Sequence, residues 1–413
     1  MKLVAGQALA VWLRGVAGGP ERKVGRLAWR DRRAWFEYDE QFLSSNLLLS
    51  PFRLPLRGGV HESPLEPFGG LFGLFDDSLP DGWGRLLQDR RATSLGLSPP
   101  SLTPLDRLAV VGRTGLGALA YEPDLRDGAA AGRALDLDEL AGESERVLQG
   151  GADEVLPELL RLGGSPQGAR PKVLVWLRPS DGHVACGLDA PSADHRRVLV
   201  KFRARSDTTE VGAVEYAYHQ LARRAGLDVP EAWLVQSRRG GGWFAVERFD
   251  RTAGGAHRHV HTLCGLLHAD HRLPSLDYVA AHAVVHRLTG DQRAVEQLFR
   301  RMVFNVVAHN RDDHTKQVSL TMQEDGRWQL APAYDLTWSD GPGGEHSMAV
   351  AGEGEPGLAA VLEVAKAAGI PARRARRVVE EVGAAVVGGW PEVAPSATTR
   401  RQIAKSLRGL DPR

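Results

Sequence analysis

The sequence predicts an α+β fold in which a mixed, β-rich N-terminal subdomain precedes two lobes, one built around strands and one mainly helical. Short apolar runs separated by turn residues recur before residue 125 and again between residues 173 and 249, whereas helical periodicity dominates near residue 300 and in the C-terminal tail. The composition also shifts at a small-residue stretch, 125–133, and at a Gly-rich stretch after Val350. The length of the chain predicts two or three domains, and the first of these stretches predicts a linker after residue 125.

The composition excludes several classes of protein. Of the 413 residues, 43% are hydrophobic and 25% are charged, which is typical of globular proteins and unlike disordered or fibrous chains. The 52 basic and 51 acidic residues leave a net charge of +1, so no overall positive field attracts nucleic acid. Two cysteines, Cys186 and Cys264, are too few for a disulfide framework, and no apolar run has the length of a signal peptide or membrane span. We expect a cytoplasmic protein that does not contact a membrane.

The first 125 residues predict a small sheet followed by a helix. Approximate alternation of apolar and polar residues indicates three short strands, at 9–13, 25–29 and 35–38. A Pro-Asp-Gly turn at 80–82 then leads into a helix that continues through Arg91.

The strand-rich lobe contains features of a phosphate-binding site. A glycine-containing stretch at 163–168 precedes a strand that begins at residue 173, and its glycines would let backbone amides approach phosphates. Lys201 lies near the end of a second apolar strand and is followed by an amphipathic helix. We expect Glu215 on this helix to hold Lys201, with Glu210 as the alternative partner. A third strand enters the connection between the lobes, where backbone groups can meet adenine.

A polar loop between a helix and a hairpin is the most informative stretch. Apolar residues recur every three or four positions over 295–307, which predicts an amphipathic helix. The next nine residues, 309–317, include six ionisable side chains, which are costly to bury without partners or ions. Two alternating runs around the turn at 324–326 predict a hairpin, and Asp335 follows it. This order of elements returns Asp335 to the neighbourhood of Asp312.

Two carboxylates brought together in this way suit phosphoryl transfer from ATP. The reaction needs one carboxylate to orient and deprotonate the acceptor hydroxyl, and oxygen ligands for Mg²⁺ beside the phosphates. In eukaryotic-type kinases the base and an amide ligand lie five positions apart, and a second carboxylate ligand follows a hairpin. Asp312 and Gln317 have this spacing, and Asp335 follows the hairpin. The spacing therefore favours Asp312 as the base, with Gln317 and Asp335 near the metal.

Five motifs, taken in order, resemble those of the HipA-like toxin kinases of bacterial toxin-antitoxin modules. They are Leu-Pro-Asp-Gly at 79–82 with Arg85, Gly-Ala-Arg-Pro-Lys at 168–172, Val-Glu-Arg-Phe-Asp-Arg at 246–251, Asn-x-Asp-x-His-x-Lys at 310–316 and Leu-Ala-Pro-Ala-Tyr-Asp at 330–335. The resemblance covers nearly the whole chain. It implies a bilobal protein-kinase-like fold with an N-terminal subdomain (1–125), a nucleotide-binding lobe (126–255) and a helical lobe with the catalytic loop (256–413).

The resemblance also implies a serine/threonine protein kinase that uses ATP and Mg²⁺. It implies a catalytic group with Asp312 as base, together with Lys201, His314 and Lys316. Gln317 and Asp335 would bind Mg²⁺, and Ser165 would be a site of autophosphorylation. The implied ATP site comprises Lys201, Gly163, Gly164, Ser165, Gly168, Ala169, Glu247, Phe249 and Asp335.

The partners implied by the resemblance are a protein substrate, such as an aminoacyl-tRNA synthetase, and a small helix-turn-helix antitoxin like HipB. Phosphorylation of the substrate would arrest growth. Contact with DNA would be indirect, through the antitoxin.

Two departures from the family pattern leave other functions open. His309 replaces a glycine, and Gln317 replaces an asparagine whose amide oxygen would lie about 1.5 Å closer to the backbone. Because Mg²⁺ tolerates little distortion, one alternative is a degenerate kinase that serves as a nucleotide-binding co-repressor module. Another is a small-molecule kinase, whose acceptor groove would be narrow and closed.

Other polar residues have simpler interpretations. We expect Asp313 at the surface, and Cys264 as a buried apolar residue. The alternating His257, His259 and His261 fit a scattered polar face better than a zinc site, because no Cys-x-x-Cys or His-Glu-x-x-His motif accompanies them. The basic tail after Gly357 fits a solvated helix face better than a DNA-binding surface.

Overall fold

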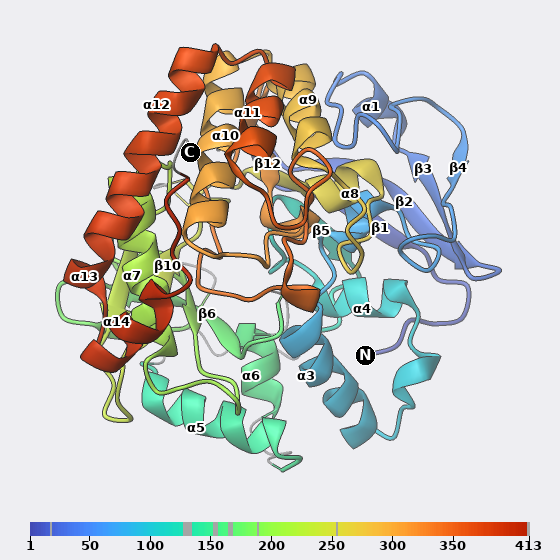
Figure 1. The fold of residues 1–413 in the computed structure, drawn as a ribbon. Coiled ribbons are helices and arrows are strands. Elements are labelled where there is room, and N and C mark those ends of the chain that lie inside the picture. The colour runs from blue at the N-terminus through green and yellow to red at the C-terminus, as the bar shows by residue number, and fades with distance from the viewer. Residues whose placement is uncertain are drawn as a thin grey trace.

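The computed structural model describes residues 1–16, 19–126, 134–151, 156–163, 168–187, 190–252 and 255–410. Figure 1 shows a mixed α/β molecule in which the N-terminal strands lie on one side and the C-terminal helices pack together on the other. The mixed class predicted from the sequence is therefore confirmed. Within the described ranges, no helix combines the length and the apolar character needed to cross a bilayer.

The N-terminal sheet has five antiparallel strands in the order β4-β3-β2-β1-β5. Its strands are β1 (Leu9–Leu13), β2 (Arg22–Arg30), β3 (Arg33–Tyr38), β4 (Val60–Glu62) and β5 (Leu119–Glu122). The three predicted strands fall within β1, β2 and β3. The helices of this part are α1 (Glu40–Leu43), α2 (Gly73–Asp76), α3 (Gly82–Ser94) and α4 (Pro104–Val111).

Helix α3 begins at the predicted Pro-Asp-Gly turn. Gly82 has a φ of +40°, and a Cβ at this position would lie 2.6 Å from the Cα of Ala169. Only glycine permits this close approach of two backbones. The start of α3 is thereby fixed against the residues that follow the glycine-containing stretch.

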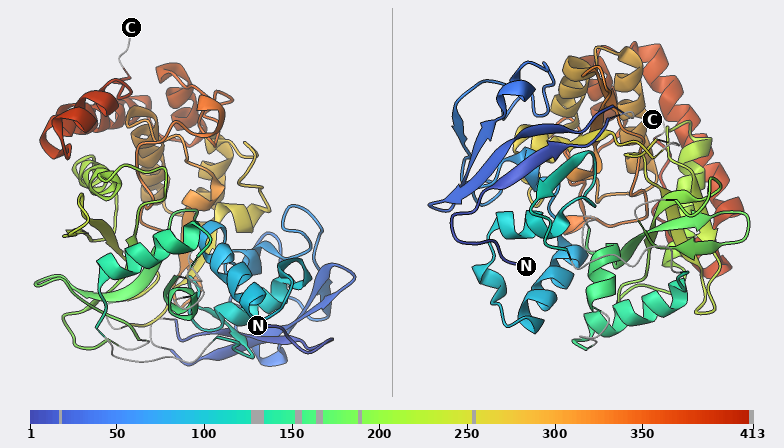
Figure 2. Two further views of the ribbon diagram at one scale, coloured as in Figure 1. Left: turned by 90° about the horizontal axis from the view of Figure 1, so that it is seen from below. Right: turned by 180° about the vertical axis from the view of Figure 1, so that it is seen from behind.

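The second sheet has the order β7-β6-β8-β10-β9 and is antiparallel throughout. Its strands are β6 (Lys172–Arg178), β7 (His183–Ala185), β8 (Arg196–Lys201), β9 (Ala232–Val235) and β10 (Trp243–Glu247). The accompanying helices are α5 (Leu137–Leu148), α6 (Leu156–Gly163) and α7 (Val211–Arg224). Figure 2 shows this sheet beside α5 and α6.

The C-terminal part is mainly helical and contains a small third sheet, β11-β12-β13. The predicted hairpin forms β12 (Ser319–Met322) and β13 (Trp328–Leu330), and β11 (His259–Thr262) adds a strand that the sequence did not predict. The helices are α8 (Leu263–Leu267), α9 (Tyr278–Thr289), α10 (Gln292–Val307), α11 (Leu358–Ala367), α12 (Ala372–Gly383), α13 (Gly389–Val393) and α14 (Ala397–Ala404). Helix α10 contains the predicted amphipathic helix and ends just before the polar loop.

One apolar core joins the N-terminal sheet to the C-terminal helices. Phe36 and Phe75 belong to the same buried cluster as Phe299 and Phe304 of α10. A second core lies under the β7-β6-β8-β10-β9 sheet, and Trp83 of α3 is part of it. The N-terminal residues therefore pack into both other parts of the molecule.

The three alternating histidines are buried, so the predicted polar face is wrong. His261 Nδ1 lies 2.5 Å from Asp77 Oδ2, His259 Nε2 lies 3.0 Å from the Leu49 carbonyl oxygen, and His257 Nδ1 lies 3.2 Å from the Gly117 carbonyl oxygen. Each ring thus contacts an acceptor in the N-terminal part, and these polar contacts compensate for burial. Among the described residues, no group of three or more His, Cys, Asp or Glu side chains is arranged to hold a metal ion.

Three of the four arginines of α12 face solvent, and the fourth, Arg374, is half-buried and pairs with Glu296 of α10. Arg373, Arg376 and Arg377 are exposed, whereas Ala375 and Val378 on the opposite face are buried. This is the solvated helix face expected from the sequence.

Candidate active site

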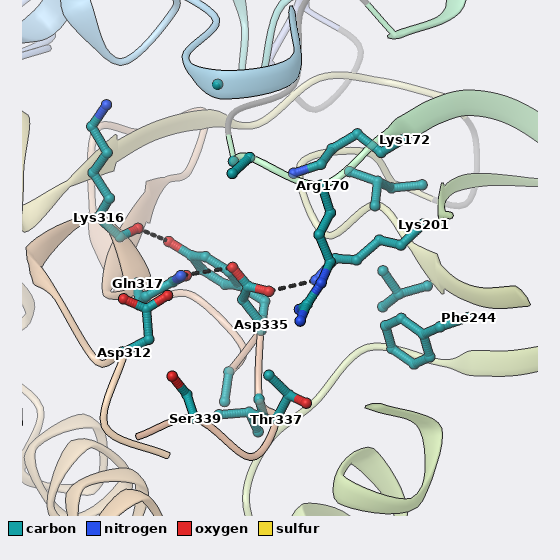
Figure 3. A pocket seen from close by; sticks show the side chains of 18 of the residues that line it. Arg170, Lys172, Lys201, Phe244, Asp312, Lys316, Gln317, Asp335, Thr337 and Ser339 are labelled. Atoms are coloured by element: carbon teal, nitrogen blue, oxygen red, sulfur yellow. Dashed lines mark hydrogen bonds and ion pairs between the residues drawn. The ribbon is translucent and has the colours of Figure 1, made fainter. Parts of the chain in front are cut away.

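A cavity of about 700 Å³ lies where the second sheet, the polar loop and the start of α3 meet. Lys201 and Phe244 line it from the sheet, Asp312 and Gln317 from the loop, and Asp81 from the N-terminal part. Figure 3 shows these segments converging on Asp335. Residues far apart in the sequence therefore form one site.

Lys201 lies between two carboxylates. Its Nζ donates to Glu215 of α7 and to Asp335, and its side chain is 11% exposed. Burial alone would lower the pKa of Lys201, but Asp335 and Glu215 raise it above its usual value. The predicted partner Glu215 is confirmed, because the alternative, Glu210, instead accepts hydrogen bonds from Ser396 and Thr399. Lys201 is therefore held as a cation.

Lys172 places a second cation beside Lys201. The two residues are directly paired across β6 and β8, and Lys172 also lines the cavity. Burial and the charge of Lys201 lower the pKa of Lys172 to about 8. The sheet thus presents two lysines to the same space.

Asp335 and Gln317, the predicted metal ligands, are in direct contact. Gln317 Nε2 donates to Asp335 Oδ2 at 2.6 Å. Carboxylate and amide oxygens suit Mg²⁺, so the donor set fits this ion. Because the amide nitrogen faces Asp335, binding of one ion by both residues requires the Gln317 amide to turn over. Burial would raise the pKa of Asp335, but Lys201 and Lys172 hold it well below its usual range, so the group is a carboxylate.

Asp312 faces the cavity from the polar loop. Its side chain is 55% exposed, and His314 Nε2 lies 3.9 Å from Asp312 Oδ1. Partial burial raises the pKa of Asp312, and nearby Asp335 adds to this effect, while His314 opposes it. A carboxylate with a raised pKa that is accessible from the cavity is suited to accept a proton.

The neighbouring Asp313 is buried, so its predicted place at the surface is wrong. Its carboxylate accepts hydrogen bonds from the Tyr278 hydroxyl at 2.8 Å and from the Ser347 amide at 2.9 Å, and His346 Nδ1 lies 2.9 Å from it. Asp313 therefore anchors the polar loop to the helical part of the molecule. The adjacent Asp312 is not engaged in this way and faces the cavity.

His309 adopts the backbone conformation that explains the glycine of the family pattern. Its φ is +56°, in the left-handed region that glycine enters without strain and histidine enters less readily. The ring stacks on Trp338 with centroids 5.9 Å apart, and Nε2 lies 3.0 Å from Asp340 Oδ1. These contacts compensate for the strained conformation, so the loop keeps its shape without a glycine.

The ammonium group of Lys316 points away from Asp312 and Asp335 (Figure 3). Lys316 Nζ lies 3.1 Å from Asp81 Oδ2 and 3.9 Å from Asp76 Oδ2, and its side chain is 7% exposed. The other Asp81 oxygen accepts from the Gly168 amide. Asp81 therefore links the polar loop to the glycine-containing stretch, and it does so through Lys316, which is 235 positions away in the sequence.

We expect an Asp81→Asn substitution to lower the free energy of unfolding by about 2 kcal/mol, because it removes the nearest charge partner of a buried ammonium group. The new amide oxygen still accepts from Gly168, so only the ion pair is lost. Urea unfolding measures the change. The control is Glu231→Gln, which removes an exposed ion pair with Arg223 and should have little effect. Equal losses in both variants would contradict this role of Asp81.

The residues predicted to bind ATP are only partly brought together. Gly168, Ala169, Glu247 and Phe249 line the cavity. Gly163 ends α6, where a Cβ would lie 2.3 Å from the Lys172 carbonyl oxygen, so its glycine permits close packing. Gly164 and Ser165 lie outside the described residues.

The connection after β10 is fixed by a buried acidic residue that the sequence reading missed. Asp250 is fully buried and lies 2.6 Å from both the Arg248 and the Arg251 guanidinium groups. It also accepts from the Gly117 amide of the N-terminal part at 2.7 Å. The alternating charges of 248–251 are a signal that could have indicated an internal ion-pair cluster. The ring of Phe249 stacks on Tyr334, with centroids 5.2 Å apart, and closes one wall of the cavity.

Comparison with known proteins gives consistent matches. The family model of the HipA-like C-terminal domain matches residues 164–390, and that of the HipA N-terminal domain matches residues 9–122. A protein of Sinorhizobium fredii named "Putative kinase Y4dM" is 31% identical over 138 residues, which cover 30% of this chain and 32% of that protein. The match thus spans about a third of the length of this relative.

A solved structure shows the same fold over almost the whole chain. HipA of Shewanella oneidensis MR-1, solved in a toxin-antitoxin complex with HipB and operator DNA, superposes with a TM-score of 0.68. The superposition covers 96% of this chain and 95% of that chain, at 18% sequence identity.

Proposed function

This chain belongs to the family of HipA-like proteins, and from this premise we propose that it is a toxin acting as an ATP- and Mg²⁺-dependent serine/threonine protein kinase. The observation that carries the proposal is the arrangement of Lys201, Asp335 and Asp312 around one cavity. A phosphate-binding cation, a metal-binding carboxylate and an accessible base are the groups that phosphoryl transfer requires.

The residues of the chain have separable tasks in the proposed reaction. Lys201, held by Glu215, binds the phosphates of ATP, and Glu247 to Phe249 contact the adenine. Asp335 and Gln317 would hold Mg²⁺, which would neutralise charge on the phosphates. Asp312 orients the acceptor hydroxyl and takes its proton as the phosphoryl group is transferred. His314, 3.9 Å from Asp312, favours the deprotonated carboxylate.

Incubation of the purified protein with labelled ATP and Mg²⁺, combined with calorimetry, tests the proposal. Transfer of label to a protein serine or threonine would support it. Binding of ATP without transfer would favour a degenerate kinase that acts as a co-repressor. Transfer only to small molecules would favour a small-molecule kinase. Phosphoproteomics after controlled expression would then identify the substrate.

The structure offers a reason to prefer an active enzyme over a degenerate one. The longer side chain of Gln317 brings its amide group to Asp335, with 2.6 Å between Nε2 and Oδ2, so an amide turned over at this place would present its oxygen beside the same carboxylate. Asparagine would withdraw the amide by about 1.5 Å.

We expect Gln317→Asn to raise the Mg²⁺ concentration for half-maximal phosphate transfer about tenfold, which corresponds to the loss of about 1.4 kcal/mol of metal binding. A magnesium titration of the initial rate measures this. The matched control is Gln329→Asn on β13, whose partner is Gln323 in an exposed contact. A lower magnesium requirement in Gln317→Asn would show instead that glutamine impairs the site.

The proposal includes regulation by a partner and by self-modification. A small helix-turn-helix antitoxin would restrain the toxin and mediate its contact with DNA, by analogy with the HipA–HipB–DNA complex. Co-purification with the product of an adjacent gene would test this pairing.

Ser165 would accept phosphate from the same active site, and intact-mass analysis after incubation with ATP would detect the modification.

A further inference from the structure

We propose that Arg170 is a further catalytic residue, whose guanidinium group binds the phosphoryl group while it is transferred. This inference rests on the proposed kinase function and adds to it a residue that neither the spacing argument nor the proposed site includes. The proposed role of Asp312 toward the acceptor hydroxyl stays the same.

Arg170 is held in one orientation by a carboxylate. Its Nε donates to Asp207 Oδ2 at 2.9 Å, and one Nη donates to Asp207 Oδ1 at 3.1 Å. Asp207 is itself fixed, because Oδ2 also accepts from the Ala204 amide at 2.7 Å. Such a two-point contact fixes the plane of a guanidinium group.

The fixed guanidinium group lies at the cavity, next to Lys201. Arg170 and Asp207 both line the cavity, and Figure 3 shows the Arg170 side chain directed toward Asp335. Burial lowers the pKa of Arg170, but Asp207 raises it, and Glu215 and Asp335 contribute in the same direction. Arg170 in turn lowers the pKa of Asp312. The guanidinium group therefore lies within electrostatic reach of both carboxylates that the proposed reaction uses.

Arg170 has more free donors than the neighbouring Lys201, whose ammonium group has three N–H donors. A guanidinium group has five N–H donors, and the contact with Asp207 uses two of them. No other described residue accepts a hydrogen bond from Arg170, so the remaining donors are available to a ligand in the cavity. Lys201, by contrast, is engaged by both Glu215 and Asp335.

The chemistry of the transfer matches these donors. The bond between the γ-phosphorus and the bridging oxygen breaks, a bond from the acceptor oxygen to phosphorus forms, and the hydroxyl proton passes to Asp312 while ADP leaves. Negative charge is spread over three oxygens of the transferred group during this step. A planar cation with paired N–H groups suits those oxygens better than a lysine does. Arg170 keeps its protons throughout and acts only by binding.

Steady-state kinetics of three variants and one control test the inference. We expect Arg170→Gln to lower kcat about 100-fold, while the KM for ATP changes less than threefold. Arg170→Lys keeps the charge but loses the two-point contact, and Asp207→Asn loosens it, so each should lower kcat about tenfold. The control, Arg203→Gln, removes an arginine that lies just beyond β8 and pairs with Glu145, and should leave kcat unchanged.

A binding measurement that needs no protein substrate completes the test. ADP with aluminium fluoride imitates the transferred group, so wild type should bind the pair more tightly than ADP alone, and Arg170→Gln should lose this gain while its affinity for ADP stays the same. An Arg170→Gln protein that keeps the gain, or that keeps a wild-type kcat, would overturn the inference and leave the proposed function standing. A wild-type protein that binds no ATP would overturn the proposed function itself.

Discussion

Replacement of Asp312 by asparagine is expected to lower the kcat of phosphate transfer by about 1000-fold, because the variant cannot accept the proton of the acceptor hydroxyl. The affinity for ATP should change little, since the Asp312 side chain is largely exposed and its ion pair with His314 is long, at 3.9 Å. Steady-state kinetics with ATP and Mg²⁺, together with calorimetry, separate these two effects. A hairpin variant, Asp325→Asn, removes an exposed carboxylate paired with Arg327 and serves as the control.

The pH profile of the wild-type enzyme provides an independent check of the same role. A base works only when it is deprotonated, and partial burial raises the pKa of Asp312. Activity should therefore fall as the pH decreases through this raised pKa, starting at a higher pH than an ordinary aspartate would give. Asp312→Asn should lack this acidic limb in its residual activity. A variant that retains both the rate and the limb would exclude Asp312 as the base.

Replacement of Asp335 by asparagine is expected to lower kcat to a similar extent. The cause in this case is weaker binding of Mg²⁺ and of the phosphates of ATP. The backbone of Asp335 has a φ of +56°, which asparagine also tolerates, so the variant should keep the local conformation. It loses the negative charge that pairs with Lys201 and is available to Mg²⁺. We expect kcat to fall about 1000-fold and the magnesium requirement to rise more than tenfold.

Magnesium titration of phosphate transfer, followed by calorimetry with ATP, measures the Asp335 effect. Recovery of the rate at high Mg²⁺ would assign the loss to metal binding alone. An unchanged magnesium requirement would contradict the assignment of Asp335 as a ligand. Asp325→Asn, which changes the exposed hairpin carboxylate paired with Arg327, is the control here too.

The sequence predicts those contacts of the site that join elements adjacent in the chain. Asp335 follows a hairpin whose two strands pair directly, so the chain must return to the polar loop from which the hairpin starts. Glu215 lies on the first turns of α7, the helix that follows the strand of Lys201, and the ion pair needs only the connection between them. In both cases the contacts depend on elements adjacent in the sequence.

Contacts between distant segments could not be predicted in the same way. Asp312 and Asp313 are identical in type and adjacent. Asp313 is the buried one because it meets distant partners such as Tyr278 and His346, which are 35 and 33 positions away. The third strand β11 and the ion pair of Asp81 with Lys316 also depend on how separate parts pack together. The local pattern of apolar and polar residues contains no information about such pairings.

The apolar core shared by the N-terminal sheet and α10 limits how relatives of this chain can diverge. Phe36 and Phe75 belong to the same buried cluster as Phe299 and Phe304, so the apolar surface of the N-terminal segment is matched to that of the C-terminal part. The N-terminal segment is thus a poor candidate for recombination as an exchangeable module. Chimaeras that join it to the catalytic half of a distant relative should misfold unless the residues on both sides of this core are transplanted together.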